Sequence, residues 1–229
     1  AYKYGSSALK TIMTELSNPF QFSIEDAIYN VLDIDGYDLY EDFINTINDK
    51  YKRLIKPIEI NYIKPNIIKD SGTANLFPIW SPDNNSFLYL SNKDNDYFGQ
   101  TDLYIHDFTD SSDKKISGGV FSAPAWNPNG HIVYYSKKPK FPDKNGSKYY
   151  DLYEYNLSTK KEKRITQSSR AFSPVFVTKD SSIAYLATYD GSQDIHQINL
   201  KSREIIKITD FEDRPILSSL AYNENNHSL

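Results

Sequence analysis

The stretch Phe77-Pro78-Ile79-Trp80-Ser81-Pro82-Asp83 recurs along the chain, and its recurrence decides the fold. The later copies are Ala-Pro-Ala-Trp-Asn-Pro-Asn at 123–129, Ser-Pro-Val-Phe-Val-Thr-Lys at 173–179 and Ser-Leu-Ala-Tyr-Asn-Glu-Asn at 219–225. From Trp80 onward the aromatic positions follow at intervals of 46, 50 and 46 residues. A repeat of this length is typical of the four-stranded blades of a β-propeller.

Two further markers repeat in step with the first. An Asp-Leu-Tyr or Asp-Ile-His triplet opens an alternating strand at Asp102, Asp151 and Asp194. Each unit closes with an isoleucine, spaced 49 and 43 residues apart: Ile116, Ile165 and Ile208. A carboxylate at a repeated position more often bonds backbone groups of a neighbouring loop than performs chemistry, so we predict that all three aspartates are structural.

Each unit has the pattern of a small antiparallel sheet. A turn rich in Pro, Asp and Asn follows the aromatic position, because these residues favour chain reversal. The next strand is apolar, as in 132–135, and the third alternates, as in 152–157, which gives it one wetter face. The fourth is short and charged, as in 160–164, and we interpret it as an outer edge strand rather than a binding patch.

The sequence therefore predicts a mainly β protein, a partial β-propeller of four-stranded antiparallel blades preceded by a small α-helical segment. The helical segment covers 1–57 and is interpreted as the tail of a truncated upstream domain, and 58–71 form a linker or first strand. The blades cover 72–229: three are complete (72–117, 118–166 and 167–209) and a fourth is incomplete (210–229).

Helical periodicity marks the first part of the chain. One helix is predicted over 5–16, and a second runs from an N-cap at Ser23 to Asp35-Gly36. A third is predicted from its N-cap, Asp38, to Pro57. This helix carries an apolar stripe that must be buried against something: Leu39, Phe43, Ile47, Tyr51 and Leu54.

Charge and composition exclude several classes of function. Residues 1–60 contain 6 Lys and Arg against 10 Asp and Glu, whereas 61–229 contain 20 of each, so nucleic acid is not an expected partner. The chain has no cysteine for disulfide or thiolate chemistry, and no stretch approaches the roughly 20 apolar residues of a membrane helix. It starts at Ala1 without Met and stops inside a repeat, so we expect a fragment, and a missing signal peptide is uninformative.

No catalytic, cofactor-binding or metal-binding residue is predicted. The chain has no His-Glu-x-x-His, no Gly-x-Ser-x-Gly, and no pair of histidines at i, i+4 among His106, His131, His196 and His227. His106 and His196 fall in third strands, where packing within the blade is the better interpretation. Asp94 and Asp96 lack the full ligand set of a calcium loop, so we prefer a solvated connection there.

The long connection from Lys137 to Lys148 is the most distinctive loop of the sequence. Besides its two ends it carries Lys138, Lys140 and Lys144. A flexible, solvated insertion is one interpretation. The other is recognition of an acidic partner through these three lysines, since loops on rigid scaffolds often carry function.

The Trp-Ser-Pro-Asp turn at 80–83, the Asp-Leu-Tyr strands and the closing Ile-Thr at 165–166 and 208–209 resemble TolB-type, WD-like propeller repeats over roughly residues 72–229. Thr178-Lys179-Asp180 replaces the Ser-Pro-Asp turn and weakens the third copy. Over shorter motifs, such as Ser23-Ile24-Glu25-Asp26-Ala27, the head resembles the last helices of bacterial zinc-metallopeptidase-like domains that precede such propellers.

These resemblances imply a non-catalytic scaffold or interaction module of a bacterial envelope or secreted protein, in the periplasm or outside the cell. They imply a protein, peptide or polysaccharide partner, bound at the central mouth or on the loops, and no cofactor. Two alternatives stay open. One is the accessory propeller of a zinc metallopeptidase whose catalytic helix lies upstream, and the other is the propeller of a prolyl-oligopeptidase-like serine peptidase.

Overall fold

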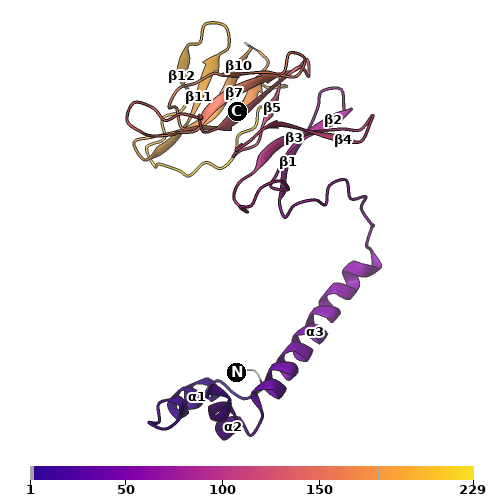
Figure 1. Cartoon of the computed structure of the whole chain (residues 1–229), viewed down its shortest axis with the longest axis vertical. Helices are drawn as coiled ribbons and strands as arrows, with labels where there is room; N and C mark the ends of the chain where they lie inside the picture. Colours follow the sequence, from indigo (N-terminus) through magenta and orange to yellow (C-terminus); the bar gives the residue numbers. More distant parts are fainter. Residues whose placement is uncertain (1–2, 180) are drawn as a thin grey trace. The chain divides into compact units, whose positions relative to one another are not determined.

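The computed structural model describes residues 3–179 and 181–229. The chain falls into two compact units, one ending at Asn66 and the other spanning Ile67–Leu229, and each is described by itself (Figure 1). The first unit is helical and the second is built of strands. Ala1 and Asp180, which entered the sequence interpretation, lie outside the described residues.

The first unit contains α1 (Ala8–Leu16), α2 (Ile24–Leu32) and α3 (Gly36–Ile60). The predicted N-cap of α2 is confirmed, because the Ser23 hydroxyl accepts a hydrogen bond from the Asp26 backbone N–H at 3.3 Å. The predicted cap of α3 is wrong. Asp35, not Asp38, caps this helix, and its Oδ1 accepts from the Tyr37 N–H at 2.8 Å. The glycine that follows Asp35 is itself the first helical residue, which moves the cap three positions earlier.

The prediction that Pro57 ends the third helix is also wrong, since α3 continues for three more residues. Proline removes one backbone donor, and this close to the C-terminus little of the hydrogen-bond ladder depends on it. The Asn61 side chain donates to the Pro57 carbonyl at 3.3 Å. Within this unit the apolar stripe is not buried: Phe43, Tyr51 and Leu54 are each more than half exposed.

The described residues of the second unit form three four-stranded antiparallel sheets, in the orders β1-β2-β3-β4, β5-β6-β7-β8 and β9-β10-β11-β12. The strands are β1 (Asn75–Trp80), β2 (Ser86–Ser91), β3 (Asp102–Asp107), β4 (Ser112–Ser117), β5 (Ala125–Trp126), β6 (Ile132–Lys137), β7 (Asp151–Asn156), β8 (Lys161–Arg164), β9 (Ala171–Val177), β10 (Ser182–Tyr189), β11 (Ser192–Asn199) and β12 (Ile205–Lys207). Each sheet joins consecutive strands, as a propeller blade does, so the predicted fold class is confirmed.

The aromatic positions that set the sequence period converge in space. Trp80, Trp126, Phe176 and Tyr222 line one hollow of about 500 Å³, at the ends of β1, β5 and β9. Beyond β12 the described residues form no further strand, only an isolated bridge between two residues, 223 and 228. Tyr222 nevertheless lines the same hollow as the other three, and the fourth blade stays a prediction.

The two larger core clusters lie at the faces where successive blades stack. Tyr134 and Tyr135 are neighbours in β6 and therefore point to opposite faces of the middle sheet. Tyr135 packs with Leu88 of the first blade, and Tyr134 packs with Tyr185 of the third. Because burial of each large apolar side chain stabilises the fold by about 1.5–3 kcal/mol, these two interfaces hold the three blades together.

Different side chains close the same turn in successive blades. After Trp80, the Ser81 hydroxyl donates to Asp83 Oδ1 at 2.5 Å. After Trp126, Asn127 Oδ1 accepts from the backbone N–H groups of His131 and Ile132 at 2.9 Å each. In both blades the turn is therefore closed by a side-chain hydrogen bond, although the residue that makes it differs.

Candidate functional site

The repeated aspartates are buried at the start of each third strand and bind the segment that leads to the next blade. Asp151 is fully buried. Its Oδ2 accepts from the Ser168 N–H at 3.0 Å and from the Arg164 guanidinium at 2.6 Å. Its Oδ1 accepts from the Ser169 N–H at 3.0 Å and from the Thr166 hydroxyl at 2.9 Å.

Asp102 and Asp194 repeat this arrangement. Asp102 Oδ1 accepts from the Gly119 N–H at 2.9 Å, and Asp194 Oδ1 accepts from the Phe211 N–H at 3.1 Å. Burial opposes the ionisation of both, but the hydrogen bonds and the lysine beside each outweigh it, so the pKa of Asp102 and of Asp194 is lowered. All three carboxylates bond backbone groups of a neighbouring loop, as predicted.

The histidines of the third strands take part in packing, as predicted. His106 lies 4.9 Å from the Phe108 ring, and its Nδ1 is 3.0 Å from an oxygen of Asp113. His196 lies against Tyr185 at 5.8 Å, and burial lowers its pKa. Within residues 3–179 and 181–229, no group of three or more acidic or histidine side chains is placed to hold a metal ion.

Two further carboxylates, Asp113 and Glu162, form ion pairs with lysines. Asp113 pairs with Lys69 at 2.9 Å and with Lys93 at 3.0 Å. Burial alone would raise the pKa of Asp113, but the hydrogen bonds from these lysines and from His106 lower it to about 2. In the second blade Glu162 pairs with Lys137 at 2.6 Å, which outweighs burial and likewise lowers the pKa of Glu162.

We therefore expect acid to destabilise the second unit. The folded-state pKa of Asp113 lies below its unfolded value of 3.8, and that of Glu162 below 4.5. Their contribution is present above the unfolded values and is lost as pH falls from about 4.5 toward 2. Melting temperature followed by circular dichroism should drop across this window, and less steeply in Asp113→Asn than in the unchanged chain. Equal slopes would contradict the assignment to Asp113.

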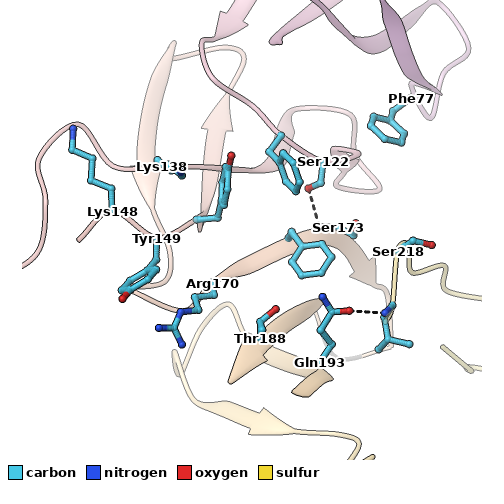
Figure 2. Close-up of a pocket in the computed structure, with 14 residues that line it drawn as sticks. Phe77, Ser122, Lys138, Lys148, Tyr149, Arg170, Ser173, Thr188, Gln193 and Ser218 are labelled. Atoms are coloured by element: carbon cyan, nitrogen blue, oxygen red, sulfur yellow. Dashed lines mark hydrogen bonds between the residues drawn. The ribbon is translucent and has the colours of Figure 1, made fainter. Parts of the chain in front are cut away.

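A larger cavity, of about 730 Å³, opens among the blades at a different set of residues (Figure 2). We call it the basic cavity. Phe77 lies in β1, Ser122 and Lys138 flank β5 and β6, and Ser173 lies in β9. The rest of its described lining is Phe121, Lys148, Tyr149, Tyr150, Arg170, Phe172, Thr188, Gln193, Leu217 and Ser218. Residues from successive repeats thus meet around one hollow.

Two hydrogen bonds fix the wall of the basic cavity. The Ser122 hydroxyl accepts from the Ser173 N–H at 2.8 Å and ties the second blade to the third. Gln193 Oε1 accepts from the Leu217 N–H at 2.5 Å and holds the segment that follows the third blade. Both bonds are drawn in Figure 2. The wall is therefore built from contacts between repeats rather than from one loop.

The lysine-rich connection reaches this cavity in part. Lys138 and Lys148 line it, whereas Lys140 and Lys144 are not among the described lining residues. Sequence reasoning missed Arg170, which comes just before β9, and the two tyrosines that end the connection. The Tyr-Tyr pair beside a run of lysines was the one available signal, since aromatic and cationic side chains together often mark recognition surfaces.

The fold and the basic cavity define the class: the chain is a partial β-propeller of four-stranded blades. Within that class its sequence is similar to TolB. It is 35% identical over 105 residues to the Tol-Pal system protein TolB of Ruthia magnifica subsp. Calyptogena magnifica, covering 44% of this chain and 22% of that protein. It is 32% identical over 98 residues to that of Vesicomyosocius okutanii subsp. Calyptogena okutanii (strain HA), covering 42% and 20%.

Solved structures agree on the fold. TolB from Acinetobacter baumannii superposes with a TM-score of 0.53 at 19% identity, over 65% of this chain and 35% of that one. A putative TolB from Agrobacterium tumefaciens gives 0.50 at 20% identity, over 62% and 50%. The chain spans about a fifth of the length of its curated relatives, and no family model matches it. In the described part of the chain, no helix has the length and apolar character to cross a membrane.

Proposed function

We propose that the chain is a non-catalytic interaction module that binds a protein or peptide segment in the basic cavity. The observation that carries the proposal is the cavity itself, about 730 Å³ and shared among successive blades, which is the size range of recognition sites. Similarity to a protein named for the Tol-Pal system supports a protein partner and a periplasmic setting. We keep 72–229 as the proposed extent of the propeller.

A second proposal concerns the helical unit. The apolar stripe of α3, including Phe43, Tyr51 and Leu54, is exposed within its own unit, and such a stripe is normally covered. This supports an accompanying domain in the full-length protein, such as the zinc-metallopeptidase-like domain that the head resembles. Parent-gene sequence encoding His-Glu-x-x-His ahead of residue 1 would support it, and its absence there would remove it. The serine-peptidase alternative and a polysaccharide partner stay predictions that these observations do not favour.

The binding proposal is tested by selecting peptides from a displayed random library on the full chain and measuring their affinity for two variants. Ser218→Trp puts a bulky ring into the basic cavity, whereas Glu224→Trp puts the same ring at the hollow lined by the repeat aromatics. We expect Ser218→Trp to weaken binding by about tenfold or more, and Glu224→Trp by less than about twofold. Failure to select any peptide, or equal losses in both variants, would contradict the proposal.

A further inference from the structure

We infer that the basic cavity selects an acidic peptide segment, one that carries carboxylates next to an aromatic or aliphatic side chain. This inference rests on the proposed function and names the chemistry of the bound segment. It is carried by three features: cations without an acidic partner among the described residues, an apolar floor between them, and a loop that holds two of the cations.

Two of the three cations of the cavity stack on tyrosines, and among the described residues none of the three forms an ion pair with an acid. Lys138 Nζ lies 5.1 Å from the centre of the Tyr150 ring, and the Arg170 guanidinium lies 4.3 Å from that of Tyr149. Lys148 Nζ donates to a backbone carbonyl at 2.8 Å. Figure 2 shows all three cationic side chains on one side of the hollow. Among the described lining residues none is acidic, so the charged side chains of the lining itself are all positive.

Other cations of the same unit behave differently. Lys137 and Arg164 each bind a carboxylate of their own blade, both at 2.6 Å, and Lys93 binds one at 3.0 Å. Among the described residues, no ion pair of this kind involves Lys138 or Arg170. Bringing like charges together is unfavourable unless an anion binds between them. A guanidinium that is stacked on a ring can still donate its edge N–H groups to a carboxylate.

The floor of the cavity accepts an apolar side chain. Phe121 stacks on Tyr150 with ring centres 4.7 Å apart, and Phe77, Phe172 and Leu217 complete the apolar lining. A peptide supplies carboxylates and an apolar side chain together. An acidic sugar would bring many hydroxyl groups that each need a hydrogen-bond partner, whereas most of the surface lining the cavity is apolar. A peptide therefore fits this lining better than a polysaccharide does.

The connection that bears Lys138 and Lys148 is held by its own acidic residue. Asp143 Oδ1 accepts from the backbone N–H groups of Asn145 and Ser147 at 2.9 Å each, and the Asp143 N–H donates to the Ser147 carbonyl at 2.8 Å. The carboxylate of this loop thus closes a turn, and among the described residues no ion pair joins it to Lys138 or Lys148. A loop that is already ordered loses less conformational entropy when a ligand binds.

The test uses the fluorescein-labelled peptide Glu-Phe-Glu-Asp-Leu-Glu, its isostere Gln-Phe-Gln-Asn-Leu-Gln, and fluorescence anisotropy on the full chain. The cavity variant is Lys138→Gln, Lys148→Gln, Arg170→Gln. The matched control removes the same charge elsewhere: Lys140→Gln and Lys144→Gln in the same connection, and Lys161→Gln on the exposed edge strand β8. A third variant, Lys138→Arg, Lys148→Arg, Arg170→Lys, keeps the charge.

We expect the acidic peptide to bind at least about tenfold more tightly than the isostere, and the cavity variant to abolish that preference. The control and the charge-keeping variant should stay within about threefold of the unchanged chain. The inference is overturned if the isostere binds equally well, if the control loses as much as the cavity variant, or if an oligogalacturonate of equal charge binds more tightly than the peptide. If Ser218→Trp weakens the binding of the selected peptides but binding does not depend on charge, the proposed function stands and only this inference is removed.

Discussion

Replacing Asp151 with Asn should lower the free energy of unfolding by about 3 kcal/mol, a large part of the stability of a small domain. The carboxylate is fully buried and accepts hydrogen bonds from two backbone N–H groups, a hydroxyl and a guanidinium. In asparagine, an NH2 group replaces one of the two carboxylate oxygens. This NH2 group is a donor, and it would face the donor groups that the carboxylate binds. The Arg164 side chain is about one-third exposed, so its lost ion pair contributes less than the unmet backbone groups.

Urea unfolding followed by far-ultraviolet circular dichroism measures this effect. Asp213→Asn is the matched control, since it makes the same chemical change at an exposed position of the same unit and should shift stability by less than about 0.5 kcal/mol. An unchanged midpoint in Asp151→Asn would show that this carboxylate does not hold the blades in register. Asp194→Asn should also destabilise, because that side chain is nearly as buried.

Trp126→Ala should cost about 3–5 kcal/mol, because it removes a large ring from between two blades. Trp126 is 8% exposed, and its indole N–H donates to the Ile79 carbonyl of the preceding blade at 3.2 Å. Trp80 occupies the same place in the preceding repeat but is 52% exposed. Trp80→Ala is therefore the matched variant, and it should cost only about 1–2 kcal/mol, mainly from its stacking on Phe108 at 5.2 Å.

The two tryptophan variants are compared by urea unfolding, again with circular dichroism, since fluorescence changes when either indole is removed. The expected order of stability is unchanged chain, then Trp80→Ala, then Trp126→Ala. Equal losses would mean that the position in the repeat, and not packing between blades, sets the contribution of each ring. A smaller loss in Trp126→Ala than in Trp80→Ala would contradict the described burial directly.

Much of the blade architecture was predictable from the repeat. The spacing from Trp80 to Trp126 and beyond located each blade, and the alternation after Asp151 located its third strand. These features depend on neighbours within one repeat, where strand alternation and turn residues act over a few positions. The bonding of the aspartates to backbone groups of a neighbouring loop was predictable for the same reason, because a position that recurs in every repeat serves what every repeat needs.

The basic cavity was predictable only in part. The sequence directed attention to Lys138 and its neighbouring lysines, but it did not separate Lys148, which lines the cavity, from Lys144, which is not among its described lining residues. Nor did it include Arg170, which belongs to a different blade. Residues of different repeats meet only when the blades stack, and local patterns along the chain carry no information about that contact.

By itself, the sequence predicted four-stranded repeats, the strands within each and the bonding of the repeated carboxylates to backbone groups of a neighbouring loop. Tertiary structure alone decided which tryptophan is buried and which cations gather around one hollow. The physical reason is the distance along the chain over which each kind of interaction acts. Backbone preferences and side-chain alternation act between residues close in the chain, whereas burial and the accumulation of charge depend on surfaces that come together only after the blades have formed and stacked.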